Sequence, residues 1–291
     1  MYRIFKGIEV YELRSLLRNL SYSKLILLGI AMMLLIPNWL LETYKLKWVL
    51  MQQSKSAPFF TCLKGVLTGV TLGIVTPARL GEYAGRMMAF SKERRTMIAG
   101  ATMVTSLCQM AVTLFIGALC ALALFRDYQY LEQGWVWMGV ILSFASIILG
   151  LLYWPALLRS LDNFSIIKTK LNGSFVPNIS RLGMTRVLGL SCLRYFVYTI
   201  QFLLVLMAIG VETPPGYLLL HLPLIFFLQT LLPLPPITSF VGRASVAVVV
   251  LSQLGLSDLY ILTASSMIWV INLVIPAFLG LGLIWWLSFS R

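Results

Sequence analysis

Long apolar runs separated by short polar intervals fill most of the chain. Five runs are long enough to cross the roughly 30 Å hydrocarbon core of a bilayer as helices, at about 24–44, 96–125, 135–158, 187–211 and 259–289. Three shorter runs lie at about 59–77, 216–235 and 238–256. The polar intervals between the runs are too short to hold a soluble domain. We therefore predict an all-α polytopic integral membrane protein with about seven or eight apolar segments, forming a single transmembrane domain over residues 24–291.

Residues 1–23 have a different pattern, in which basic and apolar residues alternate. The basic positions are Arg3, Lys6, Arg14 and Arg18. This pattern is typical of an amphipathic helix that lies on a membrane surface. A cleaved signal peptide fits poorly, because the apolar run begins too late and no small-residue cleavage site follows. We predict a basic amphipathic N-terminal arm.

The segment 59–88 combines a glycine-rich apolar run with an abrupt break. Glycines recur every fourth residue, at Gly65, Gly69 and Gly73. On a helix this spacing forms one small-residue face that lets another helix backbone approach closely, so we interpret these glycines as a packing face. Pro77 then interrupts the helix. We predict that this segment is broken or re-entrant.

Charged residues follow the break directly, at Arg79, Glu82 and Arg86, with Gly81 between them. If residues 78–88 are helical, the three charges share one face as plus, minus, plus. Charges beside a membrane segment are costly unless they are paired, hydrated or functional, so they mark a candidate binding site. The alternative is a cytoplasmic loop whose internal Arg–Glu pair caps the helix.

The segment 216–256 is broken in a similar way. Pro233 and Pro236 end one apolar stretch, and Gly242 and Arg243 lie within the next. Prolines that interrupt short apolar segments at corresponding positions of two halves point to a transport site. Sequence identity between the halves is too low to establish a repeat, so the repeat is a hypothesis here. Arg243 is a candidate site residue, with snorkelling to the interface as the alternative.

Two further charged positions lie within or beside apolar runs. Arg194 lies inside the run 187–211 and is either a third arginine of the site or a residue near the cytoplasmic edge. Glu42 lies with Lys45 and Lys47 where the first run ends. We interpret these three residues as a cluster at the membrane interface, next to Trp48 as an interfacial anchor.

The composition supports a membrane protein and makes the charge easier to interpret. The 291 residues are 59% hydrophobic and 11% charged, whereas soluble domains average about 25% charged residues. The net charge of +13 fits lysine- and arginine-rich cytoplasmic loops and attraction to anionic lipid headgroups, so we expect no nucleic acid partner.

The basic intervals 79–95 and 159–186 are predicted to be cytoplasmic. If 59–77 crosses fully, the N-terminal arm is also inside; if 59–77 is re-entrant, the interval 42–55 is inside and the arm is outside.

The sequence offers little for catalysis or metal binding. The single histidine, His221, has no neighbouring Cys, Asp or Glu, and the four cysteines lack metal-type spacing. We find no Ser-His or Cys-His arrangement, no paired intramembrane carboxylates and no acid-rich metal motif. We expect a protein that is not an enzyme and holds no metal or cofactor.

Three stretches resemble one known family, the transmembrane region of lysylphosphatidylglycerol synthases. Thr76 to Glu82 resembles its "P-x-R-x-G-E" signature, and Trp39 to Trp48 resembles its "E-x-x-R-W" element with Lys in place of Arg. Leu232 to Arg243 resembles its "P-x-x-x-G-x-G-x-R-E" element, although Ala244 stands where the family has Glu. The resemblance covers about residues 24–289.

The resemblance implies a flippase-like domain of the cytoplasmic (inner) membrane that moves an anionic or aminoacylated lipid, or a lipid-linked intermediate, between leaflets. Arg79, Arg86 and Arg243 would hold phosphate, with Arg194 as a further partner, and Glu82 would orient them or neutralise a cationic headgroup. No segment fits the soluble aminoacyl-transferase domain of the bifunctional members, so we do not expect aminoacyl transfer. The alternative is a membrane partner, without transport activity, of a cell-envelope glycosyltransferase or lipid-modifying enzyme.

Overall fold

The structure is a computed structural model that describes residues 21–53, 57–76, 79–125, 138–139, 141–143, 145–146, 177, 179–231 and 236–289. The predicted arm of residues 1–23 and the apolar run at 135–158 lie almost wholly outside these ranges. Every element in the described part of the chain is a helix. Within this described part, four helices are long and apolar enough to cross a membrane: Tyr22–Met51, Lys92–Leu124, Arg181–Ala208 and Asp258–Trp285. The predicted all-α polytopic membrane fold is confirmed.

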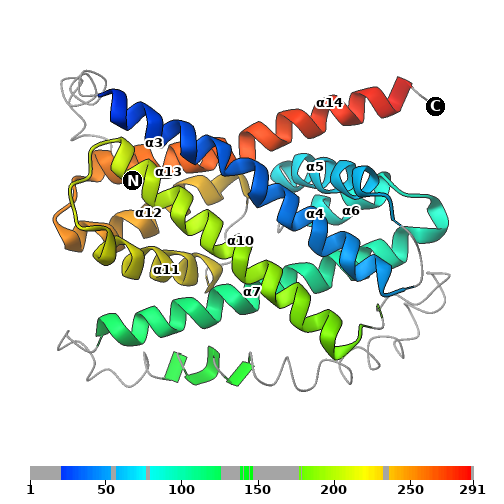
Figure 1. The fold of residues 1–291 in the computed structure, drawn as a ribbon, viewed down its shortest axis with the longest axis horizontal. Coiled ribbons are helices and arrows are strands. Elements are labelled where there is room, and N and C mark those ends of the chain that lie inside the picture. The colour runs from blue at the N-terminus through cyan, green and yellow to red at the C-terminus, as the bar shows by residue number, and fades with distance from the viewer. Residues whose placement is uncertain are drawn as a thin grey trace.

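The helices form two sets with the same order (Figure 1). The first set contains α3 (Tyr22–Met33), α4 (Leu35–Met51), α5 (Phe59–Val75), α6 (Leu80–Met88), a short 3-10 turn (Lys92–Arg94) and α7 (Arg95–Phe125). The second contains α10 (Arg181–Ala208), α11 (Pro215–Leu231), α12 (Pro236–Leu251), a 3-10 turn (Ser252–Leu254), α13 (Asp258–Trp269), a π-helical turn (Val270–Val274) and α14 (Ile275–Phe289). Each set thus begins and ends with a long helical stretch, and two shorter helices lie between these stretches: α5 and α6 in the first set, α11 and α12 in the second.

The first broken segment doubles back on itself, because α6 returns along α5. A Cβ atom built on Gly85 would lie 2.4 Å from the carbonyl oxygen of Thr68, and one on Gly81 would lie 2.2 Å from that of Leu72. Gly65, Gly69 and Gly73 face α6 from the other side of the contact. Since both ends of the segment lie at the same end of the molecule, its geometry is that of the re-entrant alternative. Pro77 lies outside the described residues.

The second broken segment has the same plan in α11 and α12, which pack against each other. The break at residues 232–235, including Pro233, lies outside the described residues. Pro236 is the first residue of α12, where a proline is tolerated because the first helical N–H has no partner within the helix. Gly242 and Arg243 lie in the second turn of α12.

The two sets run in opposite directions and form an inverted repeat. Ser180 beside α10 donates to Gln52 after α4 at 3.1 Å, and Gln201 near the other end of α10 donates to the carbonyl oxygen of Ala31 at 2.8 Å. Helix α10 is therefore antiparallel to α3 and α4. Figure 1 shows the same opposition between α7 and the final helices α13 and α14. Inverted repeats of this kind are characteristic of transporter folds.

Matched contacts between the two sets support the repeat. Helix α7 packs on α11, and α14 packs on α5. A Cβ on Gly117 of α7 would lie 2.4 Å from the Phe227 side chain, and one on Gly280 of α14 would lie 2.2 Å from Thr71 Oγ1. Phe227 and Thr71 are each the thirteenth residue of a 17-residue helix. We call the pairs α5–α6 and α11–α12 the hairpins of the two halves. The last helix of each half therefore crosses the hairpin of the other half at the same position.

Candidate functional site

A cavity of about 590 Å³ lies between the two halves, within the usual size range of small-molecule sites. All five charged residues that the sequence analysis proposed for the site line this one cavity: Arg79, Glu82, Arg86, Arg194 and Arg243. They come from α6, its N-terminal flank, α10 and α12. Helices α4, α7, α11 and α13 and the π-helical turn supply the rest of the wall. The fold thus brings together charges that are far apart in the sequence.

Glu42 is the centre of this charge cluster. One carboxylate oxygen accepts from Arg86 Nη2 at 2.8 Å, and the other lies 2.7 Å from Lys45 Nζ and 3.0 Å from Arg194 Nη1. The Glu42 and Lys45 side chains are 5% and 0% exposed. Their assignment to an interfacial cluster was therefore wrong. The physical reason is that the helix continues to Met51, which places both residues inside the protein instead of at the end of a span.

Arg86 joins Glu42 to the hairpin. Its Nη2 donates to both Glu42 and Glu82, and its side chain is 1% exposed. Glu82 also pairs with Arg79 at 3.4 Å. Arg79 precedes α6 in a left-handed conformation with φ 57°, and its side chain is 41% exposed. The three charges of the first motif therefore meet, but Arg86 belongs to the buried network while Arg79 stays accessible.

A chain of uncharged polar groups extends the network across the middle of the molecule. Arg194 Nε donates to Asn38 Oδ1 at 2.9 Å, and Asn38 Nδ2 donates to Asn272 Oδ1 at 2.6 Å. On the opposite side, Gln109 Oε1 accepts from Lys45 Nζ at 2.9 Å. Asn272 lies in the π-helical turn, a local irregularity that is frequent at functional sites. Sequence reasoning missed Asn38 and Asn272; an amide in the middle of an apolar run was the available signal.

The cavity wall repeats the symmetry of the fold. Asn38, Trp39 and Glu42 line the cavity from α4, and the residues at one constant offset along the chain, Arg194, Tyr195 and Tyr198, line it from α10. Helix α7 and the stretch formed by α13 and the π-helical turn likewise contribute residues at one constant offset. Thr105, Ser106, Gln109 and Met110 correspond to Ile268, Trp269, Asn272 and Leu273. The two halves therefore present equivalent surfaces to one shared site.

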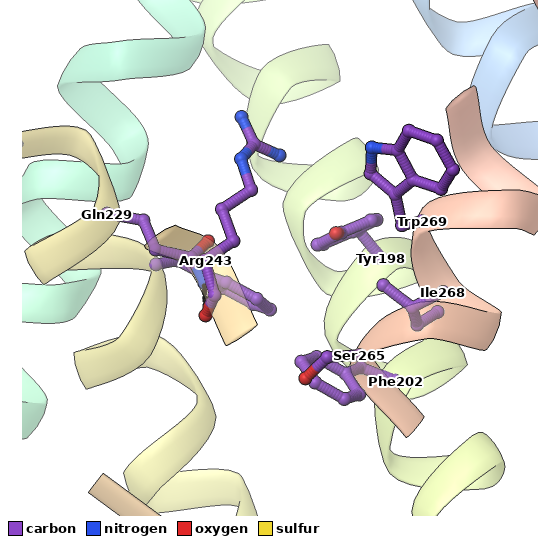
Figure 2. A pocket seen from close by; sticks show the side chains of 8 residues that line it. Tyr198, Phe202, Gln229, Arg243, Ser265, Ile268 and Trp269 are labelled. Carbon is purple, nitrogen blue, oxygen red and sulfur yellow. Dashed lines mark hydrogen bonds between the residues drawn. The ribbon is translucent and has the colours of Figure 1, made fainter. Parts of the chain in front are cut away.

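Arg243 differs from the other arginines of the cavity. Figure 2 shows its guanidinium extending away from the side chains of Ser265 and Phe202, between α11 and the helix that carries Tyr198. Within the described residues it forms no ion pair; only its backbone carbonyl is engaged, by Gln229 Nε2 at 3.0 Å. A small pocket of about 30 Å³ lies beside it, lined by aromatic residues that include Tyr198, Phe226 and Trp269. Among the described residues, Arg243 thus places a cation without an ion-pair partner at the cavity.

The described lining of the cavity carries a positive excess, with four arginines and two glutamates. Each carboxylate oxygen of Glu42 and Glu82 already has a cationic partner. Among the described residues, Arg243 is the arginine of the lining without a carboxylate partner, and Arg79 is partly exposed although it pairs with Glu82. An arginine is well suited to hold phosphate, because its planar donors match phosphate oxygens in pairs. Among the described residues, no three His, Cys, Asp or Glu side chains gather as metal ligands do.

A comparison with known protein families gives a match over nearly the whole chain. The model of the family described as "Lysylphosphatidylglycerol synthase TM region" matches residues 1–280. This range contains both broken segments and every charged residue of the cavity. No protein with a curated description matches the chain.

Proposed function

Since the chain belongs to the lysylphosphatidylglycerol synthase transmembrane-region family, we propose that it moves a lipid with a polar headgroup between the leaflets of the cytoplasmic (inner) membrane. The observation that carries this proposal is the charged cavity between two inverted halves. A headgroup that crosses hydrocarbon needs a polar site near the middle of the spanning helices. Asn38 and Arg194 lie near the middle of the helices Tyr22–Met51 and Arg181–Ala208.

The broken helices supply the remaining features of a translocation site. Arg79 and Glu82 flank the start of α6 and line the cavity. Helix N-termini carry a partial positive charge that favours anionic groups. In transporters, discontinuous helices present such ends to a substrate at the midplane, and one half of an inverted repeat moves against the other. In this mechanism Arg79 and Arg243 bind the headgroup, while Glu42 and Arg86 hold the site together.

The location of the charges also separates translocation from docking. A membrane partner that only binds an envelope enzyme needs its recognition residues on an outer surface. In the described structure Arg86 and Glu42 are buried, and Arg194 is 22% exposed where it meets Glu42. Such an internal network favours a substrate that enters the protein, and the docking hypothesis does not explain the cavity.

The distribution of basic residues suggests an orientation. Lys92, Arg94, Arg95 and Arg181 lie at the end of the molecule where α4 ends and α10 begins. Lysine- and arginine-rich ends face the cytoplasm. We therefore place the base of the α5–α6 hairpin on the cytoplasmic side and the start of α3 on the opposite side.

Leaflet exchange in liposomes tests the proposal. The purified protein is reconstituted with headgroup-labelled lipids, and the loss of signal to a membrane-impermeant quencher is followed with time. We expect exchange by the unaltered protein, and its loss in Arg79→Ala and Arg243→Ala. Arg186→Ala is the matched control, because Arg186 stacks on Trp48 at 4.5 Å away from the cavity. Absence of exchange for every lipid in well-folded protein would contradict translocation and favour the docking partner.

A further inference from the structure

We infer that the cavity selects a lipid whose headgroup is an anionic phosphate without a free amine, and that it disfavours aminoacylated lipids. This inference rests on the proposed function and deepens it by naming the substrate class. It does not follow from the family description, which refers to an enzyme that makes a lysyl lipid. It follows from which charges in the cavity are already paired and which are free.

Every carboxylate oxygen of Glu42 and Glu82 in the cavity is already paired with a cation. Glu42 contacts three cations, and Glu82 contacts two. An incoming lysyl amine would have to displace one of these cations. A displaced Lys45 or Arg86 would be a buried charge without compensation, which is strongly unfavourable. A displaced Arg79, which is 41% exposed, would remain beside the amine as a further positive charge. Neutralisation of a cationic headgroup by Glu82, the second of its two proposed roles, would therefore leave the cavity with one more positive charge.

The donors of the cavity, in contrast, are in excess. Arg243 has no ion-pair partner in the described part of the chain, and Arg79 is 41% exposed. Arg86 lines the same cavity, and its Nε and Nη1 atoms have no hydrogen-bond partner among the described residues. Guanidinium donors without acceptors match the several oxygens of a phosphate. A monoester phosphate carries about −1.5 to −2 charges near neutral pH and would offset the positive excess most completely.

The aromatic residues near Arg243 would bring an amine close to that arginine. Aromatic faces attract ammonium groups, and Tyr198, Phe226 and Trp269 line the small pocket beside Arg243 (Figure 2). The pocket measures only about 30 Å³, roughly the space of one water molecule. A lysyl side chain does not fit into it. The same three aromatic residues also line the wider cavity, where an amine beside them would be repelled by the positive charge of Arg243.

Headgroup binding to the purified full-length protein in detergent tests the inference. Displacement of a fluorescent phosphatidic acid is measured with dioctanoyl phosphatidic acid, dioctanoyl phosphatidylglycerol, dioctanoyl lysyl-phosphatidylglycerol and inorganic phosphate. We expect phosphatidic acid to bind most tightly, then phosphatidylglycerol, with the lysyl lipid about tenfold or more weaker than phosphatidylglycerol. Equal or tighter binding of the lysyl lipid would overturn the inference. Inorganic phosphate as effective as phosphatidic acid would overturn the assignment to a lipid.

Variants locate the site. Arg243→Gln is expected to weaken phosphatidic acid binding about tenfold or more, since a charge-assisted hydrogen bond is lost. The same change should reduce the difference in binding affinity between the anionic lipids and the lysyl lipid. Arg186→Gln should bind as the unaltered protein does. If Arg243→Gln fails to fold, Arg79→Gln provides a second test of how loss of an arginine from the cavity affects lipid binding. Unchanged selectivity in folded Arg243→Gln and Arg79→Gln proteins would refute the role of these two arginines in headgroup binding.

The binding and exchange experiments distinguish a failure of the inference from a failure of the proposed function. Anion-selective binding without leaflet exchange would leave the inference intact and contradict the proposed function. Exchange of lysyl-phosphatidylglycerol as fast as that of phosphatidylglycerol would support translocation and overturn the inference.

Discussion

Arg194 donates from Nε to Oδ1 of Asn38 at 2.9 Å, and the two residues occupy equivalent positions in the two inverted halves. A contact between equivalent residues places them close to the pseudo-two-fold axis. Gln109 and Asn272 are likewise equivalent, and each contacts the first long helix of the other half: Gln109 lies against Arg194, and Asn272 accepts from Asn38. The cavity is therefore built around the axis, where a relative movement of the halves would reshape it.

Glu42→Gln is expected to destabilise the protein strongly. The neutral amide would leave Lys45, Arg86 and Arg194 without their shared counter-charge at a site where Lys45 and Arg86 are almost fully buried. Loss of one partner of a buried ion pair costs about 3–5 kcal/mol in free energy of unfolding. Thermal unfolding in detergent, followed by tryptophan fluorescence, measures the effect.

Glu212→Gln is the control for this prediction, because Glu212 is exposed in the connection between α10 and α11. A surface change of this kind is expected to stay within about 0.5 kcal/mol. A Glu42→Gln protein as stable as Glu212→Gln would show that Glu42 does not hold the network together. The double variant Glu42→Gln with Lys45→Met should regain part of the loss, since one uncompensated charge is removed with its counter-charge.

Most helices and the charged residues of the cavity could be predicted from the sequence, because both depend on local patterns. Apolar runs of spanning length predict α7 and α10, and the prolines near 77 and 233 predict the interruption of both broken segments. Arg79, Glu82, Arg86 and Arg243 stand out because charges in apolar surroundings are rare. These signals need no knowledge of which helices pack together.

The role of Glu42 and the axis residues could not be predicted, because it depends on long-range packing. Glu42 meets Arg86 and Arg194 only when α4, α6 and α10 converge. In the sequence, Lys45 and Lys47 nearby are equally compatible with a membrane interface. The two proline-broken segments raised the repeat only as a hypothesis, since its halves share positions and contacts while most side chains differ, as Asn38 and Arg194 do.

Gly85→Ala is expected to disrupt the re-entrant hairpin. The added Cβ would lie 2.4 Å from the carbonyl oxygen of Thr68 and 2.6 Å from the Gly69 backbone, so α6 would have to move away from α5. Overpacking of this kind costs about 1–3 kcal/mol, and the yield of monodisperse protein should fall. Gly189→Ala is the matched control: nothing lies within 4 Å of a Cβ there, so the change should be neutral or slightly stabilising. Equal stability of the two variants would contradict the close helix contact.

Gly117→Ala and Gly280→Ala are expected to destabilise the protein to a similar extent, because these glycines make equivalent crossings in the two halves. A Cβ on Gly280 would lie 2.3 Å from the carbonyl oxygen of Leu67, and one on Gly117 would lie 3.0 Å from that of Pro223. About 1–3 kcal/mol is the expected cost for each. Gly282→Ala, where nothing lies within 4 Å, should have no such effect. A loss confined to one of the two variants would argue against equivalent packing.

A cysteine at position 106 is expected to react with a charged maleimide, whereas one at position 193 is not. Ser106 lines the cavity, and Leu193, next to Arg194 in sequence, is 52% exposed on the outer face of α10. The comparison thus separates exposure to water from exposure to lipid at similar depth. Thiols react as thiolates, which require a hydrated site, so Ser106→Cys should be modified at least about tenfold faster in a background with the four native cysteines replaced by alanine. Dioctanoyl phosphatidic acid should slow this labelling, since its phosphate would occupy the same cavity. Equal rates at the two positions would mean that the cavity is not a hydrated path, and a polar headgroup would then have no route through the protein.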